Sequence, residues 1–300
     1  MLQRIGKSLL LLILTNILVM TMASIVFGVL TYLGIMPQGY LGASAVSCLV
    51  WGFAVAFLSL LFSKTSAKWM TGAKVITPEN AGELGWLVNM VHTQAKAAGL
   101  PKMPEVAVYD SPELNAFATG PSRSNSLVAF SSGILRAMSR DEIEGVSAHE
   151  VTHIANGDML TMTLLQGLAN AFVYFFSRLV ARLVAERIEN SGMRMLAYFA
   201  VSLVAQIVFM LLAAIPLNWF SRKREFRADA GSARIAGRQK MISALKALDR
   251  FKNQDIADED RVPEAVAALA INNGRNSMAL LFASHPPIEA RIRALETMTA

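Results

Sequence analysis

A long stretch without charged side chains sets the strongest constraint on how this chain folds. Between Ser8 and Ser63 there is no Asp, Glu, Lys, Arg or His. A Pro-Gly turn at residues 36–40 divides the stretch into two apolar segments, residues 9–35 and 41–62. Each segment reaches the roughly 20 residues that a helix needs to cross a bilayer. The stretch therefore predicts a transmembrane hairpin, since the apolar core of a cleaved signal peptide is only about 7–15 residues long.

The charges that flank this hairpin predict its orientation. Arg4 and Lys7 precede the first span, Lys64, Lys68 and Lys74 follow the second, and the turn between the spans is uncharged. By the positive-inside rule both outer ends of the hairpin lie in the cytoplasm. This distribution explains much of the net charge of +6, so the positive charge does not indicate a nucleic-acid partner.

A second pair of apolar segments follows later in the chain. Residues 196–220 carry no charge and are followed by Arg222-Lys223-Arg224, which favours another span. Residues 159–176 are weaker, because four polar residues interrupt them and polar groups are costly in lipid. Two alternatives stay open for this pair, namely two further spans or a re-entrant or docked hairpin that does not cross. Both alternatives leave the two termini in the cytoplasm.

Two polar pieces remain, residues 64–158 and 221–300, and small cores are marginal when alone. We therefore expect one cytoplasmic α+β domain built from both pieces, with residues 159–220 inserted between them and the hairpin of residues 1–63 in front. Within the first piece, residues 105–109 and 126–130 predict strands, and residues 78–98 predict an amphipathic helix that starts at Thr77-Pro78. The predicted fold class is a mainly helical membrane protein whose polar domain contains a small sheet.

His149-Glu150-Val151-Thr152-His153 is the most specific motif of the chain. Histidines four residues apart lie on one face of a helix, where both imidazoles can bind one metal ion. Glu150 projects beside them and can take a proton from the attacking water. Ser139 with Glu142 predicts the start of this helix as a capping box, and Gly157 predicts its end.

A catalytic zinc site needs a third protein ligand as well as an open position. Glu225 and Asp229 lie four residues apart in a segment that is rich in arginine. Glu225 can complete a site for one zinc ion, and Asp229 can hydrogen-bond a ligand imidazole. Taken alone, such acids usually form a solvated, salt-bridged face, but the HExxH motif favours the ligand interpretation. His92 lies among polar neighbours and is interpreted as a surface histidine.

Two other function classes are disfavoured by what the sequence lacks. A zinc ion that only stabilises a scaffold usually has four protein ligands, often cysteines, and Cys48 in the hairpin is the only cysteine of the chain. The phosphate-binding pattern GxxxxGK[ST] does not occur either, so we expect no nucleotide partner. The expected partners are therefore the lipid bilayer and substrates that are already unfolded or loosely folded.

The HEVTH and EFRAD motifs, with the preceding Asn115-Ala116-Phe117-Ala118, resemble the HtpX membrane proteases. These belong to a wider group of zinc metallopeptidases that includes the CAAX prenyl proteases. The resemblance covers essentially the whole chain, up to Ser284-His285-Pro286-Pro287. It implies a zincin-like endopeptidase of the bacterial inner membrane that cleaves misfolded or damaged membrane proteins at the cytoplasmic face. Such an enzyme would serve quality control and the stress response, and processing of prenylated peptides is the related alternative.

The resemblance also implies the roles of single residues. It implies that His149, His153 and Glu225 bind zinc and that Asp229 supports His149. Asn115 would contact the substrate backbone, and the strand at residues 126–130 would be an edge that pairs with an extended peptide. His285 and Arg291 would lie near the reaction centre, where His285 can donate to the oxyanion of the tetrahedral intermediate. A plain helix-start role stays open for His285, because Pro286-Pro287 follows it.

Overall fold

The structure is a computed structural model that describes residues 29, 32–34, 40–77, 80–258 and 285–298. The first predicted span, residues 9–35, therefore lies almost wholly outside the described residues. The chain divides into two compact units. Met1–Leu61 and Thr161–Leu217 form the apolar unit, and Phe62–Leu160 and Asn218–Ala300 form the polar unit.

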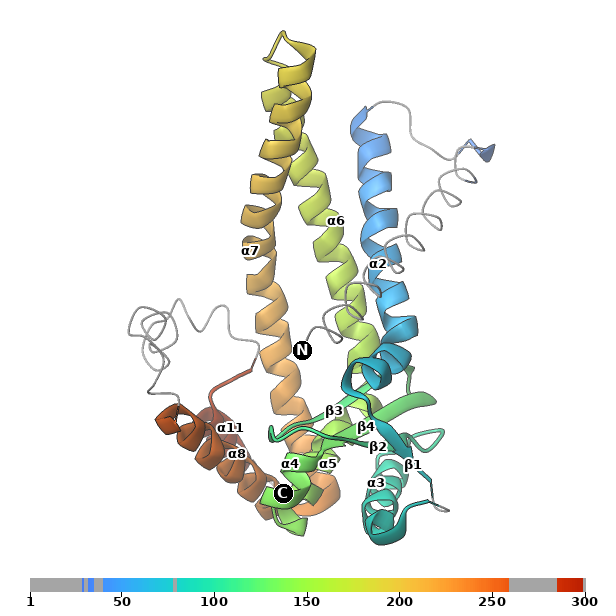
Figure 1. Cartoon of the computed structure of the whole chain (residues 1–300), viewed down its shortest axis with the longest axis vertical. Coiled ribbons are helices and arrows are strands. Elements are labelled where there is room, and N and C mark those ends of the chain that lie inside the picture. The colour runs from blue at the N-terminus through green and yellow to red at the C-terminus, as the bar shows by residue number, and fades with distance from the viewer. Residues whose placement is uncertain (1–28, 30–31, 35–39, 78–79, 259–284, 299–300) are drawn as a thin grey trace. The chain divides into compact units, whose positions relative to one another are not determined.

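Long apolar helices make up the described part of the apolar unit (Figure 1). They belong to α2 (Tyr40–Thr71), α6 (Asp158–Ala185) and α7 (Ser191–Ser232). All three are long and apolar enough to cross a membrane. The weaker apolar segment, residues 159–176, lies within the unbroken α6, whose mean hydropathy of 1.4 is below the 2.3 and 2.4 of the other two. Polar residues thus lower the hydropathy of α6 without ending the helix.

Close helix packing holds this apolar unit together. A side chain on Gly52 of α2 would meet the backbone oxygen of Gly167 on α6 at 2.5 Å, so only glycine allows this approach. Aromatic rings join α6 to α7, with ring centroids of Phe172 and Phe209 5.8 Å apart. Small residues at such contacts are typical of membrane helices, whose association depends on close packing of their backbones.

The polar unit contains a four-stranded sheet in the order β1-β2-β4-β3 (Figure 1). The strands are β1 (Lys74–Ile76), β2 (Glu105–Tyr109), β3 (Ala116–Ser122) and β4 (Asn125–Ser131). β2 and β4 pair in parallel, and the other two pairs are antiparallel. The strands predicted at residues 105–109 and 126–130 are confirmed, and with the apolar helices they confirm the predicted fold class.

The prediction that residues 126–130 form an edge strand is wrong. β4 has β2 on one side and β3 on the other, so β3 is the edge strand next to it. From Ser126 to Ser131 every residue of β4 is buried, as expected for a central strand that is covered on both faces. The edge instead belongs to the strand that follows Asn115, and this change matters for the site.

Helices cover one face of the sheet. They are α3 (Gly85–Ala97), α4 (Ser132–Ala137) and α5 (Arg140–Asn156), with α8 (Arg238–Asp258) and α11 (Ile288–Glu296) beyond them. Phe130 of β4, Leu87 of α3 and Ile143 of α5 are fully or almost fully buried in one apolar core between these layers. A five-residue π-helix, Ala233–Gly237, joins α7 to α8.

The helix predicted from Thr77-Pro78 begins later than expected. Pro78 lies outside the described residues, and Asn80 forms a turn before a 3-10 segment at Gly82–Leu84 and α3 at Gly85. The side chain of Asn80 accepts a hydrogen bond from the Thr77 backbone N–H at 2.7 Å, and the Asn80 N–H donates to the Thr77 carbonyl. These local bonds close a turn, so the chain enters the helix several residues later.

Candidate active site

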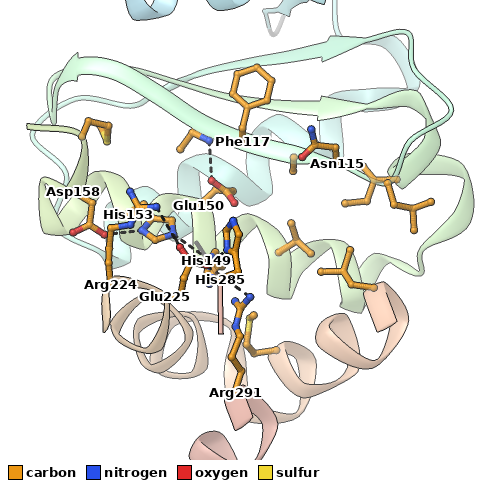
Figure 2. A pocket seen from close by; sticks show the side chains of 18 residues that line it. Asn115, Phe117, His149, Glu150, His153, Asp158, Arg224, Glu225, His285 and Arg291 are labelled. Carbon is orange, nitrogen blue, oxygen red and sulfur yellow. Dashed lines mark hydrogen bonds and ion pairs between the residues drawn. The ribbon is translucent and has the colours of Figure 1, made fainter. Parts of the chain in front are cut away.

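Helix α5 holds the HExxH motif in a fixed place. Its start is the predicted capping box, in which Glu142 accepts a hydrogen bond from the backbone N–H of Ser139 at 2.7 Å. Its end is Gly157, whose φ of 69° is the left-handed conformation that favours glycine. Both predicted helix boundaries are confirmed. Between them His149 and His153 are buried and point to the same side of the helix (Figure 2).

The nitrogen atoms of these histidines converge with the Glu225 carboxylate. The Nε2 atoms of His149 and His153 are 3.1 Å apart. Each Nε2 lies 3.4 Å from a different carboxylate oxygen of Glu225, which is only 2% exposed. Glu225 reaches the site from α7, so it meets two histidines of α5 that lie more than 70 residues earlier in the sequence. In the part of the chain that the structure describes, these residues form the only group of three that can hold a metal ion.

Each histidine also has a carboxylate at its other ring nitrogen. His149 Nδ1 lies 2.9 Å from Asp229, the residue predicted to support that histidine. His153 Nδ1 lies 2.6 Å from Asp158, the first residue of α6. An imidazole that donates its Nδ1–H to a carboxylate presents an unprotonated Nε2 to a metal ion. Both rings can therefore present Nε2 lone pairs to the same point.

Two further residues with nitrogen donors, His285 and Arg291, reach this centre from the C-terminal segment. Arg291 on α11 binds both oxygens of Asp229, with distances of 2.7 and 2.6 Å, and is buried. His285 Nδ1 lies 3.1 Å from Glu225, although 64% of the His285 side chain is exposed. Pro287 is the N-cap residue of α11, so the helix begins after Pro287 and not at His285. The structure thus places both residues beside the three candidate ligands.

The buried carboxylates change the pKa values of both histidines. Burial disfavours the protonated imidazole of His153, but hydrogen bonds to Asp158 and Glu225 outweigh this effect and raise its pKa to about 9. The pKa of His149 is also raised, because Asp229 and Glu225 outweigh the burial. Burial acts to raise the pKa of Glu225, but hydrogen bonds from the two histidines hold it far below its usual value.

Glu150 points away from the three candidate ligands, toward the sheet. Its carboxylate accepts a hydrogen bond from the backbone N–H of Ala118 on the edge strand β3, at 2.8 Å (Figure 2). Asn115, at the start of this strand, accepts a hydrogen bond from the Ser131 N–H through its backbone oxygen at 2.9 Å. The edge strand and the HExxH helix thus face each other across the site.

These elements enclose an open cavity of about 470 Å³. All of the residues predicted for the site except Asp229 line it, and Asp229 lies behind His149. Two charged lining residues were not predicted: Asp158 and Arg224, whose Nη2 lies 3.3 Å from Glu225. Asp158 could have been predicted from the sequence. It directly follows Gly157, which ends one helix, and an acidic residue at that point can begin the next helix while it stays near the histidines. His92 lies outside the site, with Nε2 3.2 Å from the carbonyl of Pro104.

The residues present fit a catalytic metal ion. Two imidazole nitrogens and a carboxylate, with all ligand atoms within 4.8 Å of one another, are a donor set that suits divalent transition metals. The two Nε2 atoms point at the same space, and the Nδ1 atoms lie 2.9 and 2.6 Å from Asp229 and Asp158. Three protein ligands leave a further coordination position open for water or substrate.

Comparisons with known proteins find similar sequences and a similar fold. The model of peptidase family M48 matches residues 82–299. The chain is 49% identical over 300 residues to protease HtpX homolog of Nitrosomonas eutropha, which covers 97% of this chain and 99% of the relative. It is 50% identical over 274 residues to protease HtpX of Mannheimia succiniciproducens, covering 91% and 94%. The crystal structure of S. mikatae Ste24p has a similar fold, with a TM-score of 0.63, 18% identity and coverage of 94% of this chain and 65% of that chain.

Proposed function

The chain belongs to peptidase family M48 and is a membrane metalloprotease, and we propose that it is a zinc-dependent endopeptidase of the bacterial inner membrane. Its proposed substrates are misfolded or damaged membrane proteins, cleaved at the cytoplasmic face without ATP as part of quality control and the stress response. The observation that carries this proposal is the convergence of His149, His153 and Glu225 beside Glu150 in one open cavity.

Zinc is proposed because of the donor set and its surroundings. Catalytic zinc sites commonly have two histidines and one glutamate as protein ligands. When bound, zinc would polarise the scissile carbonyl and lower the pKa of the attacking water. Asp158 and Asp229 would keep both imidazoles in the orientation that ligation needs.

Glu150 is the proposed general base. Its carboxylate lies in the cavity, where it can take a proton from the attacking water and give it to the leaving amine. The Ala118 N–H holds the carboxylate in place from the edge strand. His285 is the proposed donor to the oxyanion, because it lies beside the Glu225 carboxylate. Arg291 is proposed to support the site through its two hydrogen bonds to Asp229.

The edge strand β3 supplies the proposed backbone contact to substrate. Asn115 bonds to β4, so the residues that alternate with it, Ala116 and Ala118, turn their backbone groups away from β4. The Ala118 N–H bonds to Glu150, which agrees with this alternation. An extended peptide can pair with these outward groups as an additional strand. Substrates would therefore have to be unfolded at the cleavage point.

The proposed location follows from the chain itself. His153 precedes the start of α6 by five residues, and Glu225 belongs to the same helix as the apolar residues 196–220. Few residues thus separate the ligands from apolar segments, which supports cleavage near the membrane surface. Processing of prenylated peptides stays a second candidate only through the wider group, because the likeness to Ste24p concerns the fold alone at 18% identity.

The test is hydrolysis of an unfolded protein by the full-length chain in detergent. We expect activity with zinc, loss with a chelator, and recovery when zinc is returned. Glu150→Gln should keep bound zinc and lose at least about 10²-fold in turnover, a typical contribution of a general base. Glu144→Gln is the matched control, because Glu144 lies on the same helix but pairs with Lys240 outside the cavity. Near-normal turnover of the Glu150→Gln protein would contradict the proposed mechanism.

A further inference from the structure

Four side chains of α7 form a strip at the end of the apolar part of this helix. The strip comprises Trp219, Phe220, Lys223 and Arg227, all within the polar unit. Phe220 and Lys223 precede Arg227 by seven and four residues, so these side chains share one face of the helix. Glu225 is two residues from each cation and therefore points to the opposite side, toward the candidate metal site. The strip and the metal site thus lie on two sides of the same helix.

Aromatic rings hold both cations of the strip in place. Lys223 Nζ lies 4.0 Å from the centroid of the Trp219 ring. Arg227 Cζ lies 5.7 Å from the centroid of the Phe220 ring, and Arg227 Nη2 lies 4.0 Å from Asp158. Lys223 is nevertheless exposed, and so is 55% of the Arg227 side chain. Two oriented positive charges therefore stay open to a partner.

The residues around these cations are typical of a membrane boundary. Residues 196–220 of α7 carry no charge, so both cations follow directly after an apolar stretch. Trp219 is 53% exposed at the end of this stretch, and Leu160 near the start of α6 is also exposed. Tryptophan is enriched where lipid tails meet headgroups, because its ring is apolar and its N–H is polar. An exposed tryptophan beside two cations fits the surface of a bilayer.

We infer that the strip binds the headgroups of anionic phospholipids. The lipid phosphate accepts hydrogen bonds from Lys223, a point-charge donor, and from Arg227, a planar fork. The acyl chains contact the exposed ring of Trp219. A zwitterionic headgroup has no net charge, so the two cations favour anionic lipids over zwitterionic ones. The bound headgroup lies beside Asp158, the partner of His153, and therefore next to the candidate active site.

This role differs from the effect of basic residues on the orientation of a span. Orientation depends on how many Lys and Arg residues lie near the end of a helix. Lipid binding depends on where their side chains lie. Arg224 is the informative comparison, because it directly follows Lys223 but lines the cavity beside Glu225. Arg224 thus carries the same charge as Lys223 without belonging to the strip.

The first test counts bound lipids. The full-length chain in detergent is titrated with phosphatidylglycerol or with phosphatidylcholine, and native mass spectrometry measures how much of each is bound. We expect phosphatidylglycerol to bind more tightly by about fivefold or more, since each basic residue near a membrane surface contributes about that factor. Equal binding of the two lipids would overturn the inference. A dimer without bound phosphatidylglycerol would also overturn it, because a second copy of the chain would then cover the strip.

Two variants that remove the same charge connect this preference to the strip. Lys223→Gln should weaken the binding of phosphatidylglycerol about fivefold and leave that of phosphatidylcholine unchanged. Arg224→Gln is the matched control and should keep the preference. Thermal unfolding in detergent checks that both variants are folded. An equal loss in both variants would show that net charge, and not the strip, selects the lipid.

Arg227 gives a second comparison that does not depend on Arg224. Arg227→Gln should weaken the binding of phosphatidylglycerol about fivefold, whereas Arg227→Lys keeps the charge and should keep the preference. Unchanged binding in Arg227→Gln would contradict the assignment of this residue to the strip. Inorganic phosphate should not displace the lipid, and displacement would overturn the inference in favour of a site for free anions. These measurements need no substrate, so an inactive protein would contradict only the proposed function.

Discussion

At the scale of single residues, the two acids of the ExxxD segment differ in their contacts. Glu225 faces both Nε2 atoms at 3.4 Å, whereas Asp229 lies behind His149 and accepts hydrogen bonds from Nε and Nη2 of Arg291. The Arg291 guanidinium and His149 outweigh burial and hold the pKa of Asp229 below its usual range. Asp229 is thus a fixed anion that connects Arg291 to one of the candidate ligands.

These different contacts predict different losses of metal. Glu225→Ala leaves two histidines and should lose most of the bound zinc and the activity. Asp229→Asn keeps the size and one acceptor oxygen, so it should retain measurable zinc and a weakened enzyme. Partners of ligand histidines typically contribute about 10–100-fold in affinity or activity. Metal content by mass spectrometry, measured together with peptide hydrolysis, distinguishes the two variants. If Asp229→Asn lost the metal and Glu225→Ala kept it, Asp229 would be the third ligand.

The sequence predicted most of this site, because spacing on a helix determines which side chains share a face. His149 and His153 are one such pair, and Glu225 and Asp229 are another. Asp158 was missed because its contact with His153 depends on the turn at Gly157, where one helix ends and the next begins. The spacing of residues within a single helix does not predict a contact between the end of one helix and the start of the next. The same reason explains Arg224, whose place in the cavity depends on how α7 meets α5.

At the scale of elements, the sequence-based prediction was wrong about which strand lies at the edge of the sheet. The edge strand is β3 and not β4. Both β3 and β4 have strand character, and only the pairing of β4 with β2 decides which of them is central. The parallel partner lies about 20 residues earlier in the chain, so local patterns do not reveal it. The unbroken apolar run of Leu127 to Phe130 is the one local sign of a central strand.

The edge position predicts that one backbone N–H is needed for catalysis. Ala118→Pro removes the N–H that binds Glu150, and proline is tolerated where a strand N–H points away from the sheet. We expect a folded protein with kcat lowered about 10–100-fold, since a hydrogen bond to a charged group contributes about 1.5–3 kcal/mol. Ala118→Ser keeps the N–H and serves as control. Unchanged kcat in a folded Ala118→Pro protein would exclude this role.

The connection of α2 to the sheet predicts a pH dependence of stability. Lys64 and Lys68 of α2 pair with Glu105 at the start of β2. Burial acts to raise the pKa of Glu105, but hydrogen bonds from these lysines outweigh it and lower the pKa. A lowered pKa in the folded state contributes stability above the ordinary value of about 4.3, and that stability is lost as the pH falls through the folded pKa.

Glu105→Gln tests this dependence. Because the pair is partly exposed, the variant should lose less than about 1 kcal/mol of unfolding free energy at pH 7. The difference between the two proteins should close as the pH falls below about 4 and should shrink at high salt. Thermal unfolding in detergent at several pH values measures it. A difference that persists at low pH would show that packing, and not the charge, is responsible.

At the scale of the whole molecule, the main prediction concerns topology. α6 and α7 are both long enough to cross a bilayer, and the short connection between them ends at Asn190. In a Cys48→Ala background, a cysteine at Asn190 should react with an impermeant reagent from outside. A cysteine at Ser124, in the exposed turn of the polar unit, should react only after permeabilisation. Labelling of Asn190 from inside alone would mean that the pair does not cross.

The domain boundaries at residues 63, 158 and 220 stay predictions, and so does the cytoplasmic side of the polar unit.

The order of apolar and polar units along the chain could be predicted from hydropathy, because lipid and water favour different side chains over long stretches. The sequence alone did not decide whether residues 159–176 form a span, because their polar residues lower the hydropathy without breaking α6.

The interruption of the polar unit by an apolar helix pair also has a consequence for biosynthesis. Ribosomes complete His149, Glu150 and His153 about 70 residues before Glu225, at roughly 5–20 residues per second. For several seconds the nascent chain therefore carries only two of the three candidate ligands, while residues 159–220 are being synthesised. The complete set of candidate ligands therefore exists only after the apolar residues 159–220 have been made.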